Sequence, residues 1–125
     1  MKIQVVILAL IAVLLIVTVF FAFFEADMEA DNRKVMTDVE TIGRALQIYH
    51  DENGFYPPNS EVNSGFSDYL SFWPTPATAN DCQIFPMYRY TQKNGGDNYT
   101  LEFCLTAEVQ NLNRGLHVLT ERGIN

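Results

Sequence analysis

The stretch VVILALIAVLLIVTVFFAFF, residues 5–24, carries no charge and contains neither Pro nor Gly. It continues without a Pro into a polar stretch with helical spacing, which ends only at Asn53-Gly54. We therefore expect one helix from Ile3 to Asp51, roughly 73 Å long at 1.5 Å per residue. The hydrocarbon core of a bilayer is about 30 Å thick, so such a helix can cross it and hold a domain beyond it.

Three interpretations of the apolar run are open: a cleaved signal peptide, a buried core helix and a membrane anchor. Signal-peptide apolar regions span about 7 to 15 residues and end in small residues, whereas this run is longer and ends in Phe20-Phe21-Ala22-Phe23-Phe24. A core helix that is apolar on every face needs a much larger protein around it. We favour the anchor. The side chains expected to form the membrane or filament surface are Val5, Val6, Ile7, Leu8, Leu10, Ile11, Val13, Leu14, Leu15, Ile16, Val17, Val19 and Phe20.

Charge is distributed unevenly about this run. Lys2 precedes it, and all fifteen acidic residues follow it, beginning with Glu25 and Asp27. Because positive flanks stay in the cytoplasm, we expect an anchor in the inner or cytoplasmic membrane with the C-terminal domain outside. The net charge of −7 argues against nucleic acid as the primary partner, since phosphates require clustered Lys and Arg.

Beyond the run, apolar residues recur at the spacing of one helical face. Met28 and the residues that we expect to pack on a sheet follow steps of seven, four, three, four and three. Those packing residues are Val35, Val39, Ile42, Leu46 and Tyr49. The helix should end at Asn53-Gly54, where Gly supplies the left-handed residue, and Tyr56-Pro57 should force extended backbone.

The remaining sequence predicts a small sheet. Residues 55–86 are rich in Pro, Ser and Asn, with one short helix expected at Phe66–Trp73. Residues 87–125 alternate in three runs that are typical of strands, around Tyr88–Thr91, Tyr99–Leu105 and Leu116–Thr120. The expected fold is α+β: one long helix, with an apolar half (1–24) and an amphipathic half (25–54), packed on an antiparallel sheet of about three strands.

The chain has two cysteines, Cys82 and Cys104. A domain outside the cytoplasm lies in an oxidising compartment, where such a pair is expected to form a structural disulfide. No CxxC motif is present, which argues against a redox or zinc site.

Residues 29–57, EADNRKVMTDVETIGRALQIYHDENGFYP, resemble the helix of type IV pilins and of type II secretion major pseudopilins. In those families an apolar half-helix leads into an amphipathic half that ends in an Ala-Leu-x-x-Tyr, Asn-Gly, Tyr-Pro pattern. The matching residues here are Ala45, Leu46, Tyr49, Asn53, Gly54, Tyr56 and Pro57. The resemblance implies a ladle-shaped, pilin-like subunit without enzymatic activity. It also implies polymerisation through the apolar helix into a filament, with pilus or secretion assembly machinery as further partners.

The chain differs from the family at two features. No Gly occurs before Gly43, where a prepilin leader would end in Gly, and Val5 stands where pilins carry a Glu that pairs with a neighbour's terminal amine. Three hypotheses therefore stay open. The chain is a filament subunit, an uncleaved membrane-anchored surface protein with a pilin-like domain that does not polymerise, or a secreted protein whose apolar segment is removed.

No residue pattern in the chain indicates catalysis. There is no Ser, His and Asp constellation, no phosphate-binding Gly-rich loop and no spacing typical of a metal site, so we expect neither an enzyme nor a bound cofactor. Oxygens at Asp51–Asn53 or Asn94–Asn98 would suit Ca²⁺, but turn chemistry explains those residues equally well.

Overall fold

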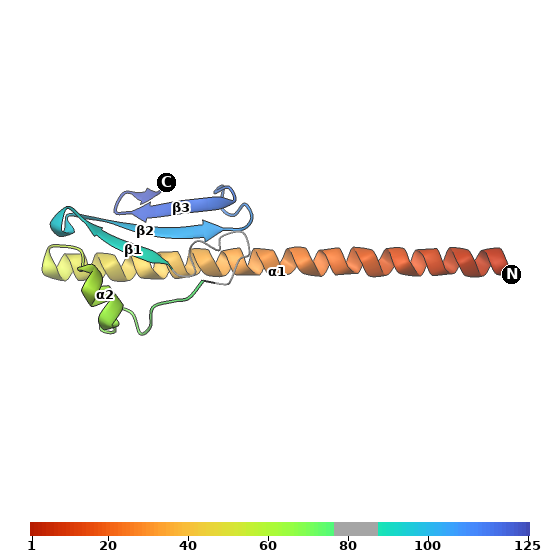
Figure 1. The fold of residues 1–125 in the computed structure, drawn as a ribbon, viewed down its shortest axis with the longest axis horizontal. Coiled ribbons are helices and arrows are strands. Elements are labelled where there is room, and N and C mark those ends of the chain that lie inside the picture. Colours follow the sequence, from red (N-terminus) through yellow and green to blue (C-terminus); the bar gives the residue numbers. More distant parts are fainter. Residues whose placement is uncertain (77–87) are drawn as a thin grey trace.

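The computed structural model describes residues 1–76 and 88–125, without the side chains at positions 25, 27, 28 and 63–65. In chain order the elements are α1 (Lys2–Asn53), α2 (Asn59–Gly65), β1 (Arg89–Lys93), the 3-10 turn η2 (Asn94–Gly96), β2 (Asn98–Leu105), β3 (Gly115–Thr120) and β4 (Gly123–Ile124). The sheet lies along the C-terminal half of α1, and the N-terminal half of α1 extends beyond the domain (Figure 1). The predicted α+β fold is confirmed.

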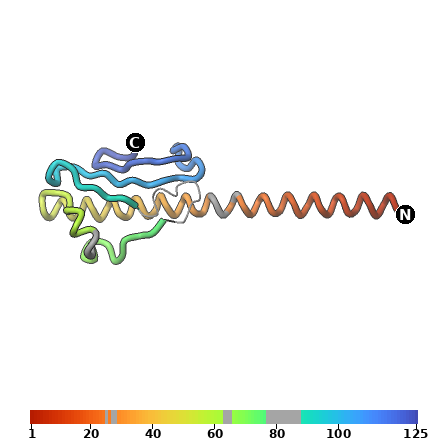
Figure 2. The backbone as a smooth tube through the Cα atoms, viewed as in Figure 1, coloured from red at the N-terminus to blue at the C-terminus, as the bar shows by residue number. Residues whose placement is uncertain are grey.

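Helix α1 is continuous over 52 residues, as the unbroken helical spacing predicts. It ends where Gly54 adopts a φ of 80° and donates its backbone N–H to the carbonyl oxygen of His50 at 2.7 Å. A residue with a side chain is strained in that conformation, which is why Gly is favoured at this position. The chain then turns back along the helix (Figure 2).

The sheet is antiparallel, with the strand order β1-β2-β3-β4. It has four strands where the sequence predicts about three. The additional strand, β4, has only two residues, and it pairs with β3 after a turn at residues 121–122. Its first residue, Gly123, has a φ of 116°. A two-residue strand is too short to show alternation, so the sequence pattern does not predict it.

The core lies between β2 and α1. Alternate residues of β2 are buried, and these side chains pack with the buried face of α1; they are Tyr99, Leu101, Phe103 and Leu105. The sheet approaches the helix closely at Gly43, where an added Cβ would lie 2.9 Å from Cδ2 of Leu119. Glycine at this position therefore leaves room for the Leu119 side chain of β3 beside the helix.

The predicted helix at Phe66–Trp73 is wrong. The helix in this segment is α2, which begins directly after Pro58, and the carbonyl oxygen of Pro58 accepts the backbone N–H groups of Glu61 and Val62. The fixed φ of Pro suits a helix start, and that signal outweighs the apolar spacing further on. Phe66 is still buried, with its carbonyl oxygen closing a turn, whereas Phe72 is 74% exposed.

Candidate functional site

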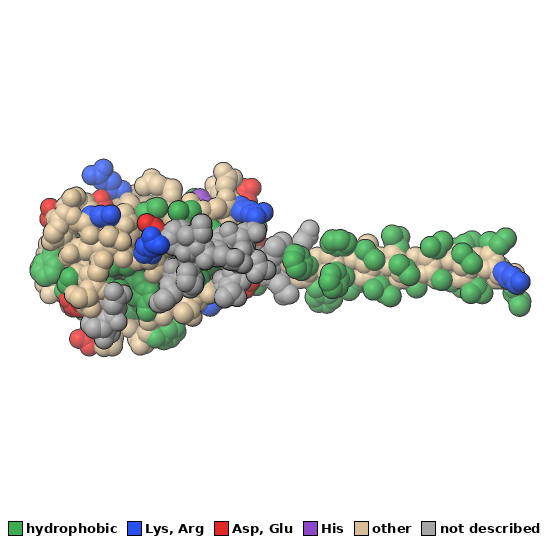
Figure 3. Space-filling view, in the orientation of Figure 1, with side chains coloured by type: hydrophobic (Ala, Val, Ile, Leu, Met, Phe, Trp, Pro, Cys, Tyr) green, Lys and Arg blue, Asp and Glu red, His purple; other side chains and the backbone are tan. Residues whose placement is uncertain are grey.

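The apolar half of α1 projects from the domain with its side chains exposed. Among the thirteen residues predicted to form the membrane or filament surface, the exposed fraction runs from 44% at Val17 to 69% at Phe20. Hydrophobic side chains cover this part of the molecule in Figure 3. Helix α1 is long and apolar enough to cross a membrane.

The two ends of this apolar surface carry charges of opposite sign. Lys2 lies at the N-terminal tip, where Figure 3 shows a basic side chain. The acidic segment from Glu25 to Asp31 follows the other end, and Glu29 forms an exposed ion pair with Arg33 one turn on. An exposed pair of this kind adds at most about 1 kcal/mol to stability, so it does little to hold the fold.

The helix face predicted to pack on the sheet lies in the core. Val35, Val39, Ile42, Leu46 and Tyr49 are all at most 5% exposed. Burial, and then the hydrogen bond that its hydroxyl donates to Glu61 at 2.9 Å, raises the pKa of Tyr49 to about 12. This bond ties the end of α1 to α2, so the predicted packing face also positions the short helix. Met28, which we expected on the same stripe, has no described side chain.

The helix-end motif forms the corner of the domain. The Asn53 side chain donates to the carbonyl oxygen of Tyr49 at 2.9 Å, next to the helix-ending Gly54. Tyr56 is buried between the rings of His50 and Tyr99, and burial raises the pKa of Tyr56.

Pro57, the last residue of this motif, is also in the core. Its side chain is fully buried, and its carbonyl oxygen accepts the hydroxyl of Tyr90 at 2.7 Å. Burial raises the pKa of Tyr90 as well. The four motif residues thus join the end of α1 to the sheet.

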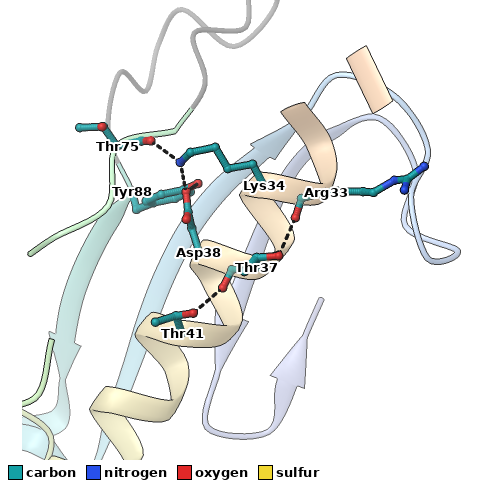
Figure 4. Close-up of polar contacts among 7 residues, drawn as sticks. All are labelled: Arg33, Lys34, Thr37, Asp38, Thr41, Thr75 and Tyr88. Atoms are coloured by element: carbon teal, nitrogen blue, oxygen red, sulfur yellow. Dashed lines mark hydrogen bonds and ion pairs between the residues drawn. The ribbon is translucent and has the colours of Figure 1, made fainter. Parts of the chain in front are cut away.

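A polar network that the sequence pattern did not indicate joins α1 to the segment before β1 (Figure 4). Asp38 accepts hydrogen bonds from Lys34 at 2.6 Å and from the hydroxyl of Tyr88 at 2.7 Å, while Lys34 also donates to the carbonyl oxygen of Thr75 at 2.9 Å. Burial, and then the bond to Asp38, raises the pKa of Tyr88. The one indication of this network in the sequence is an acid, Asp38, directly before Val39 of the buried helix face.

A second unforeseen contact involves Asn32. Its side chain is buried, and its Oδ1 accepts the backbone N–H of Thr106 at 2.9 Å and the Thr106 hydroxyl at 3.1 Å. The contact fastens the residue after β2 to α1 at the point where the helix leaves the domain. In a sequence, such a contact would be indicated by a polar residue whose helical spacing places it on the apolar face, as it does for Asn32.

The candidate calcium oxygens are used within the domain. The side chain of Gln47 donates to Asp51, Asn94 donates to Asn98, and Asn98 donates in turn to Glu121. Among the side chains that the structure describes, no three of His, Cys, Asp or Glu lie close enough together to hold a metal ion.

Cys104 is half-buried on β2, on the side of the sheet opposite the helix-facing Phe103. Cys82, its predicted disulfide partner, lies outside the described residues. The Cys82–Cys104 disulfide therefore stays a prediction.

Among the residues that carry the resemblance to pilins, Asn53 and Gly54 are exposed at the end of α1. The others are buried; they are Ala45, Leu46, Tyr49, Tyr56 and Pro57. Comparison of the chain with models of known protein families, with curated proteins and with solved structures finds no match. The pilin-like family stays a prediction from the sequence.

Proposed function

We propose that this chain is a structural subunit that is anchored by the apolar half of α1 and carries its α+β domain outside the cytoplasmic membrane. The subunit polymerises through the same half-helix into a filament of the type IV pilus or secretion pseudopilus kind, with pilus or secretion machinery assembling it. The role is structural and not enzymatic.

The observation that carries this proposal is the exposed apolar rod attached to a packed domain. Burial of apolar surface contributes roughly 25 cal/mol per Å², so a rod with every face apolar must be covered by lipid or by other helices. The domain has a core of its own, between α1 and β2, and the rod lies outside it. A membrane before assembly and a bundle of like helices after assembly both meet this requirement.

The uncleaved anchored monomer is the second candidate, and the uncharged run favours it. The pilin helix carries an acid in its apolar half that pairs with a neighbour during assembly, and residues 5–24 of this chain contain none. This candidate keeps the anchor and the outward domain but predicts no fibre.

Microscopy and extraction from the native cells test the proposal. Sheared surface material should contain fibres of this chain, and protein that has not assembled should remain in the membrane at alkaline carbonate extraction. Fibre subunits should have a processed N-terminus by sequencing and intact mass. Unprocessed protein found in membranes, with no fibres, would leave the anchored monomer as the function, and release of the protein by carbonate would overturn the anchor.

Three charges within the rod give a matched test of the anchor. The sixteen Leu, Ile, Val and Phe side chains of residues 5–24 favour insertion by roughly 5 to 10 kcal/mol. Leu10→Lys, Leu14→Lys and Val17→Lys together oppose this by a similar amount, because each central ammonium costs about 2.5 to 3.5 kcal/mol. We expect the triple Lys variant to be lost from the membrane fraction, whereas a triple Met variant at the same positions should be retained like the wild type. Equal retention of both variants would contradict the anchor.

A further inference from the structure

The sequence contains two Asn-Gly pairs, Asn53-Gly54 and Asn94-Gly95. Asn is chemically least stable before Gly, because a glycine has no side chain to keep its backbone nitrogen away from the Asn side-chain amide. All four residues are exposed, so water reaches both pairs. The two pairs therefore differ in local structure and not in access to solvent.

The first pair is held by the end of α1. Asn53 is the last residue of the helix, and its side-chain amide donates to the carbonyl oxygen of Tyr49 at 2.9 Å. The backbone N–H of Gly54 donates to the carbonyl oxygen of His50 at 2.7 Å. The Gly54 nitrogen can reach the Asn53 side chain only when both of these hydrogen bonds break and the last helical turn opens.

The second pair lies in the turn between β1 and β2, at the end of the molecule away from the N-terminus (Figure 1). Asn94 and Gly95 both have left-handed backbone, with φ of 50° and 68°. The Asn94 side chain donates to Oδ1 of Asn98 at 2.7 Å, so its contact stays within the same hairpin. Gly95 and Gly96 follow in sequence, and two glycines in a row allow the backbone to rotate after Asn94.

We propose that Asn94 is a site of spontaneous deamidation and that the end of α1 protects Asn53 from the same reaction. Asn is a thermolabile residue, and water is the only co-reactant that the site requires. The inference goes beyond the proposed function and does not depend on it, because both pairs lie within the folded domain of one chain.

The reaction has two steps. Hydroxide takes the N–H proton of Gly95, the nitrogen bonds to Cγ of Asn94, and the side-chain nitrogen takes a proton from water and leaves as ammonia. Water then opens the resulting succinimide ring by breaking one of its two C–N bonds. One opening leaves aspartate at position 94, and the other leaves isoaspartate, whose backbone runs through the former side chain.

Deamidation alters the contact between this turn and the end of α1. The new carboxylate cannot donate to Oδ1 of Asn98, and it adds a negative charge. Gly96 is buried, and its carbonyl oxygen accepts the backbone N–H of Tyr56 at 2.8 Å. Isoaspartate lengthens the backbone two residues before Gly96, so we expect this hydrogen bond to weaken in the modified chain.

Incubation of the full-length protein in detergent tests the site, at a mildly alkaline pH below the range in which its tyrosines ionise. Peptide mass spectrometry after acidic digestion should find deamidation at Asn94 at least about tenfold faster than at Asn53, because two helix-end hydrogen bonds must break before Asn53 reacts. Isoaspartate should be among the products, as the succinimide requires. In protein unfolded by denaturant, the difference between the two sites should disappear.

Gly95→Ala is the matched variant, because an added Cβ meets nothing within 4 Å and yet hinders the backbone nitrogen. Deamidation of Asn94 should then slow at least about tenfold, while the slow reaction at Asn53 stays as it was. Hydrogen exchange at the Tyr56 amide should be faster in the isoaspartate form, separated by its charge, than in Asn94→Asp, which carries the charge on a backbone of normal length.

Three results would overturn parts of the inference. Equal rates at Asn53 and Asn94 in the folded protein would overturn the protection by α1. A folded protein that keeps the Asn94 amide while the unfolded protein loses it would overturn the site. Equal exchange at Tyr56 in the isoaspartate form and in Asn94→Asp would overturn the effect of the longer backbone on the turn.

Discussion

At the scale of single residues, Gly96 combines a left-handed backbone with close neighbours. It lies in η2 with a φ of 105°, and its carbonyl oxygen accepts the backbone N–H of Tyr56 at 2.8 Å. An added Cβ would lie 2.9 Å from Cβ of Phe55 and 3.2 Å from the carbonyl oxygen of Tyr56. The hairpin turn therefore packs directly against the end of α1.

We predict that Gly96→Ala lowers the free energy of unfolding by about 2 to 5 kcal/mol, because backbone strain and overpacking add together. Gly95→Ala is the matched control: its φ is also positive, at 68°, but an added Cβ would meet nothing within 4 Å. The control should cost only about 1 kcal/mol. Denaturant unfolding of the full-length protein in detergent measures both, and equal losses would contradict the close approach.

The Asp38 network supports a second prediction at this scale. Tyr88→Phe removes the hydrogen bond to a half-buried carboxylate and should cost about 1.5 to 3 kcal/mol. Lys34→Met removes the more exposed partner of the same carboxylate and should cost less than about 1 kcal/mol. Chemical denaturation of both variants gives the comparison; a larger loss for Lys34→Met would show that the ion pair, and not the tyrosine, holds the network.

At the scale of elements, the contact between Asn32 and Thr106 determines how β2 ends against α1. Asn32→Ala should cost about 1 to 3 kcal/mol, because it leaves the Thr106 backbone N–H without that acceptor. Asn32→Asp keeps the acceptor oxygen and should retain more of the stability. Hydrogen exchange at the Thr106 amide should be faster in the first variant than in the second, and unchanged exchange in both would contradict the assignment.

The prediction of helix α1 from the sequence is confirmed, whereas the predictions of the short helix and of the number of strands are not. Its existence, its continuity and its end at Gly54 follow from local patterns, namely apolar spacing and a left-handed glycine. The short helix was misplaced because the pattern at Phe66–Trp73 is also compatible with a turn that buries Phe66, and a spacing argument does not distinguish the two. The strand β4 was missed because pairing with β3, and not its own sequence, defines it.

At the scale of the whole molecule, a group of buried tyrosines makes the domain sensitive to alkali. Burial raises the pKa of Tyr49 and of Tyr99 to about 12, and it raises the pKa of Tyr88 and Tyr90 as well. Unfolded tyrosine has a pKa of about 10, so the unfolded state loses its protons first as the pH rises.

The contribution of these tyrosines to stability is therefore complete below about pH 10 and is lost as the pH rises through about 12. We expect a cooperative loss of circular dichroism in this window, together with a rise in tyrosinate absorbance. Free tyrosine in the same detergent is the control for the absorbance change, and it should ionise near its ordinary pKa of about 10. Tyrosines that ionise near pH 10 while the domain stays folded would contradict the prediction.

The predicted Cys82–Cys104 disulfide also acts on the whole domain. Closing a loop of this length should stabilise the folded state by about 3 kcal/mol in the chain-entropy model. Reduction should lower the free energy of unfolding of the wild type by that amount and should leave a Cys82→Ser and Cys104→Ser double variant unchanged. An equal change in the free energy of unfolding of both proteins on reduction would contradict the disulfide.

The sequence by itself determined the long helix, its apolar and amphipathic halves and the face that packs on a sheet. These features depend only on the spacing of apolar residues and on the helix-ending glycine within one segment. The tertiary structure alone decided the bonds of Asn32 and Asp38 and the close approach at Gly43 and Gly96. Each of these depends on which distant residue lies opposite, and neither periodicity nor composition carries that information. For the apolar run, the single-chain structure adds nothing to what the sequence predicts, because the lipid or the other helices that would cover it lie outside the chain.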